Sequence, residues 1–173
     1  MKPGDLVFCT TTGILGKAIR FAQRRNGEVD WHRNHVAVID RLENGSWYVL
    51  QAENSGITND KELTTIAVGG TFEVVELPRT IDADGFLELL RAQVGLKYSY
   101  STIASCALNM IFPERLYFRW SNGLICSGFV ALGLTFAGFK PMEHVVDIYS
   151  ITPAQVMNLV VLGETVTAVP EKR

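Results

Sequence analysis

Two apolar strand-like runs, joined by a turn that favours a tight hairpin, constrain the fold more than any other feature. Residues 35–41 and 47–52 are rich in β-branched, aliphatic and aromatic side chains, which favour extended backbone. The Asn44-Gly45 pair between them tolerates the positive φ angles that a two-residue hairpin turn requires. We therefore expect an antiparallel sheet. Its further strands are predicted at residues 6–9, 63–68 and 71–77, with Gly69-Gly70 as a turn.

Helical patterns fill most of the remaining chain, at residues 14–25, 82–94, 101–111, 126–137 and 153–162. Gly95 stands where a helix C-cap glycine belongs, and Thr152-Pro153 supplies an N-cap and a first-turn proline. No internal repeat or linker separates these segments. We expect a single domain over residues 1–173, of class α+β, with a small antiparallel sheet packed against three or four helices.

The composition fits one folded domain. The chain has 173 residues, 47 % hydrophobic and 20 % charged, which is enough to bury a core without disulfides or a structural metal. Its formal charge of −2 leaves no broad basic footprint, so we expect no nucleic acid partner. Arg20, Arg24 and Arg25 do cluster locally, and we interpret them as a solvated helix face.

The cysteines and the apolar stretches of the sequence indicate in which cellular compartment the protein is expected. Cys9, Cys106 and Cys126 are odd in number, which argues against a disulfide framework and suits a reducing environment. The N-terminal residues lack the apolar core of a signal peptide, and the apolar stretch at 124–139 is too short and mixed to span a bilayer. We expect a cytoplasmic protein with no stable membrane insertion, unless it is phage-encoded or exported by a signal-independent route.

Cys126 begins an apolar helix-like run and is followed by the small residues Ser127 and Gly128. A thiol is a strong nucleophile only as the thiolate, and a helix N-terminus or a neighbouring imidazolium lowers its pKa. Unpaired N–H groups of the first helical turn could also stabilise an oxyanion. The alternative is a buried structural cysteine. That alternative is stronger for Cys9 and Cys106, which lie inside apolar runs.

His35 begins the first strand of the hairpin. Strand alternation puts His35 on one face with Ala37 and Ile39, and the opposite face is apolar too. The alternative to a general base is therefore a core histidine with satisfied hydrogen bonds. His32 is three residues away, but no second pair of ligands follows at zinc spacing and His144 stands apart. We predict no metal site and no cofactor.

A histidine base needs an orienting group on its second ring nitrogen. Gln51 and Glu53 lie on the neighbouring strand and point to one face, so either could accept a hydrogen bond from the imidazole. Gln51 lies deeper in the apolar run, whereas Glu53 lies nearer its end and could be a solvated strand end. The sequence leaves this choice open.

Five short motifs follow one another along the chain: Gly4-Asp5-Leu6-Val7-Phe8, His35-Val36-Ala37-Val38-Ile39, Gln51-Ala52 with Gly56-Ile57, Gly95 with Tyr98, and Cys126-Ser127-Gly128-Phe129-Val130. In this order they resemble the circularly permuted branch of NlpC-type papain-like cysteine hydrolases, which includes lecithin retinol acyltransferase-like proteins. In ordinary NlpC-type enzymes the cysteine motif precedes the histidine strand, and in the permuted branch it follows, as here. The resemblance spans about residues 3–138 and implies a permuted papain-like fold.

The resemblance also implies roles for individual residues. Cys126 would be the nucleophile and His35 the general base. The family often has Glu in a Glu-Ala dipeptide as its third polar residue, whereas this chain has Gln51-Ala52. Glutamine can orient the ring but cannot offset an imidazolium charge. Tyr98 matches a family tyrosine that helps to hold the oxyanion, and its alternative is a half-buried aromatic.

The function that the resemblance implies is thiol-dependent hydrolysis of amide bonds by a cysteine peptidase or amidase, with peptidoglycan peptides as the favoured substrate. An alternative is acyl transfer or hydrolysis of an acyl-lipid substrate, which an aromatic-rich segment at residues 106–123 would favour. A third is a non-catalytic binding module, such as a phage- or host-encoded interaction protein, which the departure at Gln51 supports. The enzyme readings require the sulfur of Cys126 and the ring of His35 to meet in a cleft that solvent reaches. The oligomeric state stays open.

Overall fold

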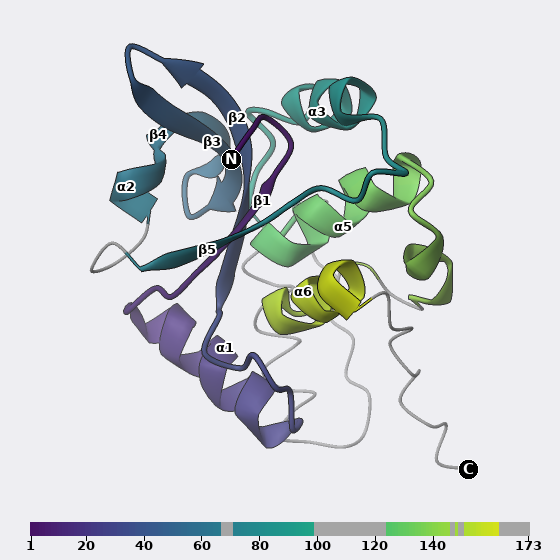
Figure 1. The fold of residues 1–173 in the computed structure, drawn as a ribbon. Helices are drawn as coiled ribbons and strands as arrows, with labels where there is room; N and C mark the ends of the chain where they lie inside the picture. The colour runs from purple at the N-terminus through teal and green to yellow at the C-terminus, as the bar shows by residue number, and fades with distance from the viewer. Residues whose placement is uncertain (67–70, 99–123, 146–147, 149–150, 163–173) are drawn as a thin grey trace.

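The computed structural model describes residues 1–66, 71–98, 124–145, 148 and 151–162 (Figure 1). The chain has an α+β fold in which one five-stranded antiparallel sheet has the strand order β4-β3-β2-β1-β5. The strands are β1 (Leu6–Cys9), β2 (His35–Glu43), β3 (Ser46–Glu53), β4 (Gly56–Glu62) and β5 (Phe72–Val75). The helices are α1 (Ile14–Arg25), α2 (Leu63–Ile66), α3 (Ala83–Arg91), α5 (Cys126–Phe136), the 3₁₀ helix η2 (Lys140–His144) and α6 (Pro153–Leu162).

The predicted hairpin is confirmed as β2 and β3. Asn44 and Gly45 have φ angles of 51° and 81°, the left-handed pair that matches the twist of the two strands. β1 pairs with the other edge of β2, so β2 is a central strand with hydrogen-bonded neighbours on both sides. Its residues Val36, Val38 and Ile39 are fully buried because both sheet faces are covered.

The two faces of the sheet are covered differently. One face carries Phe8, Val38 and Leu50, which pack with residues of α3, α5 and α6 in the larger core. The other face carries Val7 and Val49 in a smaller core with residues near α2. Figure 1 shows α3, α5 and α6 together on one side of the sheet and α2 on the other, with α1 beyond one end of the strands.

The prediction was wrong at residues 63–68, where a strand was expected. Leu63–Ile66 forms the helical turn α2, and the preceding Gly56–Glu62 forms strand β4, which no pattern indicated. β4 is an edge strand with mostly polar side chains, so its place depends on backbone hydrogen bonds to β3 and not on apolar alternation. Leu63 then needs only one turn to bury its side chain, which is 3 % exposed.

The helix ends largely follow the sequence. Asp82 caps α3 by accepting hydrogen bonds from the backbone N–H groups of Asp84 and Gly85, although the helix ends at Arg91, before the predicted end. Thr152 caps α6, because its hydroxyl accepts from Gln155 N at 3.1 Å while the Gln155 side chain accepts from Thr152 N at 3.0 Å. The predicted helix at 101–111 and the Gly69-Gly70 turn lie outside the described residues.

Within the described ranges, no helix has both the length and the apolar character needed to cross a membrane.

Candidate active site

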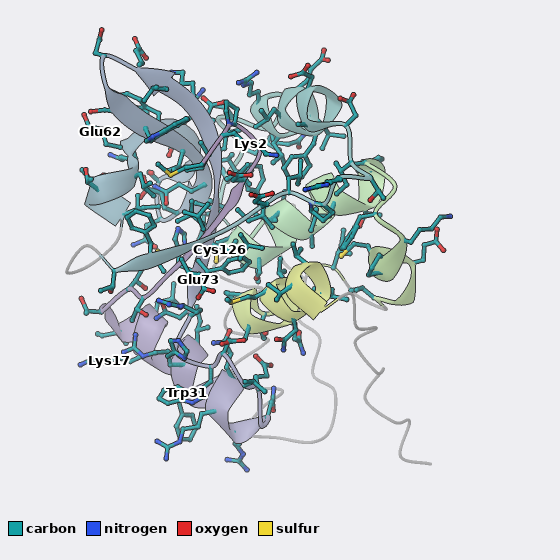
Figure 2. The ribbon with its side chains drawn as sticks, in the orientation of Figure 1. Lys2, Lys17, Trp31, Glu62, Glu73 and Cys126 are labelled. Carbon is teal, nitrogen blue, oxygen red and sulfur yellow. The ribbon has the colours of Figure 1, made fainter. Side chains whose placement is uncertain are left out.

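Cys126 is the first residue of helix α5. Ile125, at the N-cap position, has no polar side chain to occupy the N–H groups of the first turn. The next residue, Ser127, is fixed because its hydroxyl donates to the carbonyl of Ile151 at 2.6 Å. Figure 2 shows Cys126 at this helix start, in the interior between the sheet and the helices. The helix therefore points its positive end at the sulfur.

His35 is half-buried and is the first residue of β2. Its position is fixed by the buried side chain of Asn34, whose Oδ1 accepts from Thr11 N at 2.7 Å and whose Nδ2 donates to Gly16 O at 2.7 Å. These bonds tie the start of β2 to the segment that leads from β1 into α1. The imidazole is therefore carried on a rigid strand end and not on a free loop.

The structure brings three of the predicted site residues together. Nε2 of His35 lies 2.8 Å from Oε1 of Gln51, and since a carbonyl oxygen only accepts, Nε2 carries the proton. The His35 ring is also hydrogen-bonded to the side chain of Cys126. Because Nε2 is used by Gln51, Nδ1 is the nitrogen that remains for the sulfur. The three groups form a chain of contacts from sulfur to imidazole to amide.

The electrostatics of the pair favour a thiolate beside an imidazolium. Burial raises the pKa of Cys126, but the charge and hydrogen bond of His35 and the backbone N–H groups of Val36 and Ser127 outweigh it, so the pKa is lowered. Burial lowers the pKa of His35, but the charge and hydrogen bond of Cys126, then the Gln51 bond and the Glu53 charge, raise it overall. Each group thus stabilises the charged form of the other.

Glu53 and Tyr98 lie at the margin of this arrangement. Glu53 accepts from the hydroxyl of Ser55 at 2.9 Å and acts on His35 only through its charge, so the position of orienting residue is filled by Gln51. Tyr98 is half-buried and forms a parallel β-bridge with Leu124, two residues before Cys126. The bridge brings the Tyr98 backbone next to the segment that enters α5.

Two further residues pair with site residues in the sheet: Cys9, for which the sequence favours a structural role, and Thr58, which no sequence pattern singled out. Cys9 pairs with His35 in the ladder between β1 and β2, and it is fully buried. Thr58 on β4 pairs with Gln51. Oγ1 of Thr58 and Nε2 of Gln51 are both buried, and neither has a hydrogen-bond partner in the part of the chain that is described. Thr58 could have been found only by predicting β4, whose polar composition hides it.

The sulfur of Cys126 is less accessible than the ring of His35, which is half-buried. Only 3 % of Cys126 is exposed, because Leu124 and Phe129 belong to the core cluster around it. Cys106 and the aromatic-rich segment at 106–123 lie outside the described residues. In the described ranges, no three His, Cys, Asp or Glu side chains gather in a way that could hold a metal ion.

No protein-family model matches the chain, and no curated protein matches it. One solved structure with a similar fold is that of the metalloprotein yiiX from Escherichia coli O157:H7, which carries the designation DUF1105. The two structures superpose with a TM-score of 0.58 at 16 % sequence identity, over 91 % of this chain and 92 % of the other. At this identity the likeness shows a shared fold and nothing about activity.

Proposed function

We propose that this chain is a thiol hydrolase with a permuted papain-like fold, in which Cys126 is the nucleophile and His35 the general base. The observation that carries the proposal is the contact between the Cys126 side chain and the His35 ring at the start of α5. The order of the two residues along the chain supports the permuted branch, and Gln51 fills the position of the family's third polar residue with a neutral side chain. Peptide amide bonds, with peptidoglycan peptides first, are the proposed substrates.

The proposed reaction has two steps, acylation of Cys126 and hydrolysis of the acyl-enzyme. The Cys126 thiolate attacks the carbonyl carbon of the amide, and the oxyanion is held by first-turn N–H groups of α5, with Tyr98 assisting. The His35 imidazolium gives its proton to the leaving amine as the C–N bond breaks, which leaves an acyl-thioester on Cys126. His35 then takes a proton from water, the hydroxide attacks the thioester, and the acid is released as the thiol returns.

The neutral side chain of Gln51 gives this site a particular character. It holds Nε2–H in place and so directs Nδ1 to the sulfur, but it adds no negative charge to stabilise the imidazolium. The ion pair therefore depends on the thiolate itself, on the two backbone donors to the sulfur and on the more distant charge of Glu53.

The test incubates the full chain with peptidoglycan-derived peptides and, separately, with short-chain acyl esters. Cleavage of the peptides, loss of cleavage in Cys126→Ala and His35→Ala, and an acyl adduct of Cys126 seen by mass spectrometry would support the proposal. Ester cleavage alone would shift the substrate class to acyl lipids. Because yiiX is described as a metalloprotein, the assay is repeated with a chelator. Activity that the chelator abolishes, or that survives Cys126→Ala, would contradict the thiol mechanism.

A further inference from the structure

Helix α1 carries an exposed face that the core does not use. Ile14 is 90 % exposed and Phe21 63 % exposed, and they lie seven residues apart, on the same side of the helix as exposed Ala18. The loop that follows the helix adds Val29 and Trp31, which are 78 % and 36 % exposed. Single exposed apolar residues are ordinary, but this group is contiguous along one helix and its loop.

The same helix is strongly basic. Four of the chain's 16 lysine and arginine residues fall within residues 14–25, a range that contains no acidic residue, although the whole chain has a formal charge of −2. The exposed cations on it are Lys17, Arg24 and Arg25. Arg24 also stacks over the Trp31 ring at 5.4 Å from its centroid. Figure 2 shows Lys17 and Trp31 on the outer side of the molecule, around α1 and away from the sheet.

The two acidic residues just after the helix do not neutralise this face. Glu28 is half-buried and accepts a hydrogen bond from the hydroxyl of Thr152 at 2.7 Å, so it is turned toward α6. Asp30 is half-buried as well. The exposed helix face therefore combines apolar side chains with positive charge, and Lys17, Arg24 and Arg25 form no ion pair with the residues that the structure describes. This is the pattern of a helix that lies on an anionic lipid surface.

We propose that this α1 face, formed by Ile14, Lys17, Ala18, Phe21, Arg24, Arg25, Val29 and Trp31, docks on the surface of an anionic lipid bilayer. The apolar side chains enter the boundary between head groups and acyl chains, while the cations remain at the phosphate level. A nucleic acid would match the charge but would leave Ile14 and Phe21 in water. In the chain, α1 lies between β1, which ends at Cys9, and β2, which begins at His35.

The test measures co-sedimentation of the full chain with vesicles of phosphatidylcholine alone or with about one-third phosphatidylglycerol. We expect binding to the anionic vesicles only, falling as salt is added. Arg24→Glu with Arg25→Glu, or Ile14→Ser with Phe21→Ser, should each weaken it by at least about tenfold. The matched controls are Arg79→Glu and Phe136→Ser, which change an exposed cation and an apolar side chain that is 68 % exposed, both away from α1. These should bind like the unaltered chain.

Three results would overturn the docking proposal: no binding to anionic vesicles at low salt, equal binding to both vesicle types, or binding that the α1 variants do not weaken. The same assay is run with duplex DNA in place of vesicles, to detect a general binding site for polyanions. Binding to DNA without binding to vesicles would also contradict the docking proposal. Circular dichroism of each variant confirms that the fold is kept. The measurement needs no turnover and runs equally in Cys126→Ala, so its failure is separate from any failure of the hydrolase proposal.

Discussion

Cys9 lies directly opposite His35 in the β1–β2 ladder, while Cys126 reaches the same imidazole from helix α5. The sulfur of Cys9 is 3.8 Å from the carbonyl oxygen of Ile66, and the surroundings of the two thiols shift their pKa values in opposite directions. Burial and the charge of Cys126 raise the pKa of Cys9 to about 12, although Arg33 opposes this. The pKa of Cys126 is lowered because its pairing with His35 and its two backbone donors outweigh its burial. Selectivity between the two thiols is therefore a direct test of the site.

The first prediction concerns alkylation by iodoacetamide between pH 5 and 9. Because the pKa of Cys126 is lowered, its thiolate stays populated at pH values at which an ordinary thiol is protonated. Modification should therefore continue at these lower pH values and stop only when the pH falls below the lowered pKa. Cys9 should stay unmodified throughout. His35→Ala should move the Cys126 profile to higher pH, since the opposing charge is gone. Peptide mapping by mass spectrometry locates the adduct, and slow, equal labelling of all the thiols would favour a non-catalytic binding module.

The second prediction concerns the neutral orienting group. Gln51→Glu places a negative charge beside the imidazolium, which should raise the pKa of His35 further and move the alkaline limb of the pH–rate profile upward by about one unit. Glu53→Gln is the matched control, because its carboxylate acts only through its charge, and it should move the limb slightly downward. The kcat/KM profile of each variant gives the answer, and an unchanged limb in Gln51→Glu would show that His35 does not titrate in the reaction.

The third prediction concerns the close approach of α3 and α5 behind the site. A Cβ at Gly133 would lie 2.6 Å from Cε2 of Phe86 and 2.8 Å from Cδ2 of Leu90. Gly133→Ala should therefore lower the free energy of unfolding by about 1–2 kcal/mol, because overpacking exceeds the gain in helix propensity. Adding Leu90→Ala should make the Gly133 change less costly in a double-mutant cycle by urea unfolding. Gly13→Ala, at the N-cap of α1, meets nothing within 4 Å, so its cost of roughly 0.5–1 kcal/mol should come only from the poorer cap, and Leu90→Ala should leave that cost unchanged.

The fourth prediction concerns Glu28, whose pKa is raised to about 7 because burial outweighs its hydrogen bonds to Thr152 and Asn26. A carboxyl with a raised pKa contributes most to stability below its unfolded value, and this contribution is lost as the pH rises through about 7. Glu28→Gln removes the ionisable group, so the variant does not lose this contribution to the free energy of unfolding as the pH rises. The stability of the variant relative to the unaltered chain should rise by about 2 kcal/mol between pH 5 and pH 8, measured by urea unfolding. A constant difference across this range would contradict the raised pKa.

The sequence predicted those parts of the fold that local chemistry determines. Asn44-Gly45 specifies its hairpin, and Thr152 specifies the start of α6, because both act on neighbouring backbone. The sequence does not predict β4, because the position of this strand depends on its backbone hydrogen bonds to β3. The pattern at Leu63–Ile66 predicts a strand, because Thr and Ile are β-branched and a single helical turn is too short to show a helical period.

The candidate site shows the same division. The alternation of side chains along a strand places Gln51 and Glu53 on one face of the sheet. It does not show which of them orients His35, because that depends on which side chain lies opposite the imidazole in three dimensions. The proximity of Cys126 to His35 was inferred from a family resemblance, since the two residues are 91 positions apart and no local pattern relates them. The sequence left open whether the sulfur is buried, because its burial depends on how α5 packs against the sheet.

The buried side chain of Gln23 donates to the carbonyls of Trp31 and Arg33, at 2.7 and 2.9 Å, and accepts from Ala154 N at 3.2 Å. Ser127, next to Cys126, is tied to Ile151 in the same late part of the chain. Helix α1, through Gln23, and the start of α5, through Ser127, are thus both held by residues 151–154, which are synthesised after Cys126 and His35. A nascent chain in which Cys126 and His35 have already emerged still lacks Ile151 and Ala154, which bond to Ser127 and Gln23, so the site assembles only after the start of α6 has been synthesised.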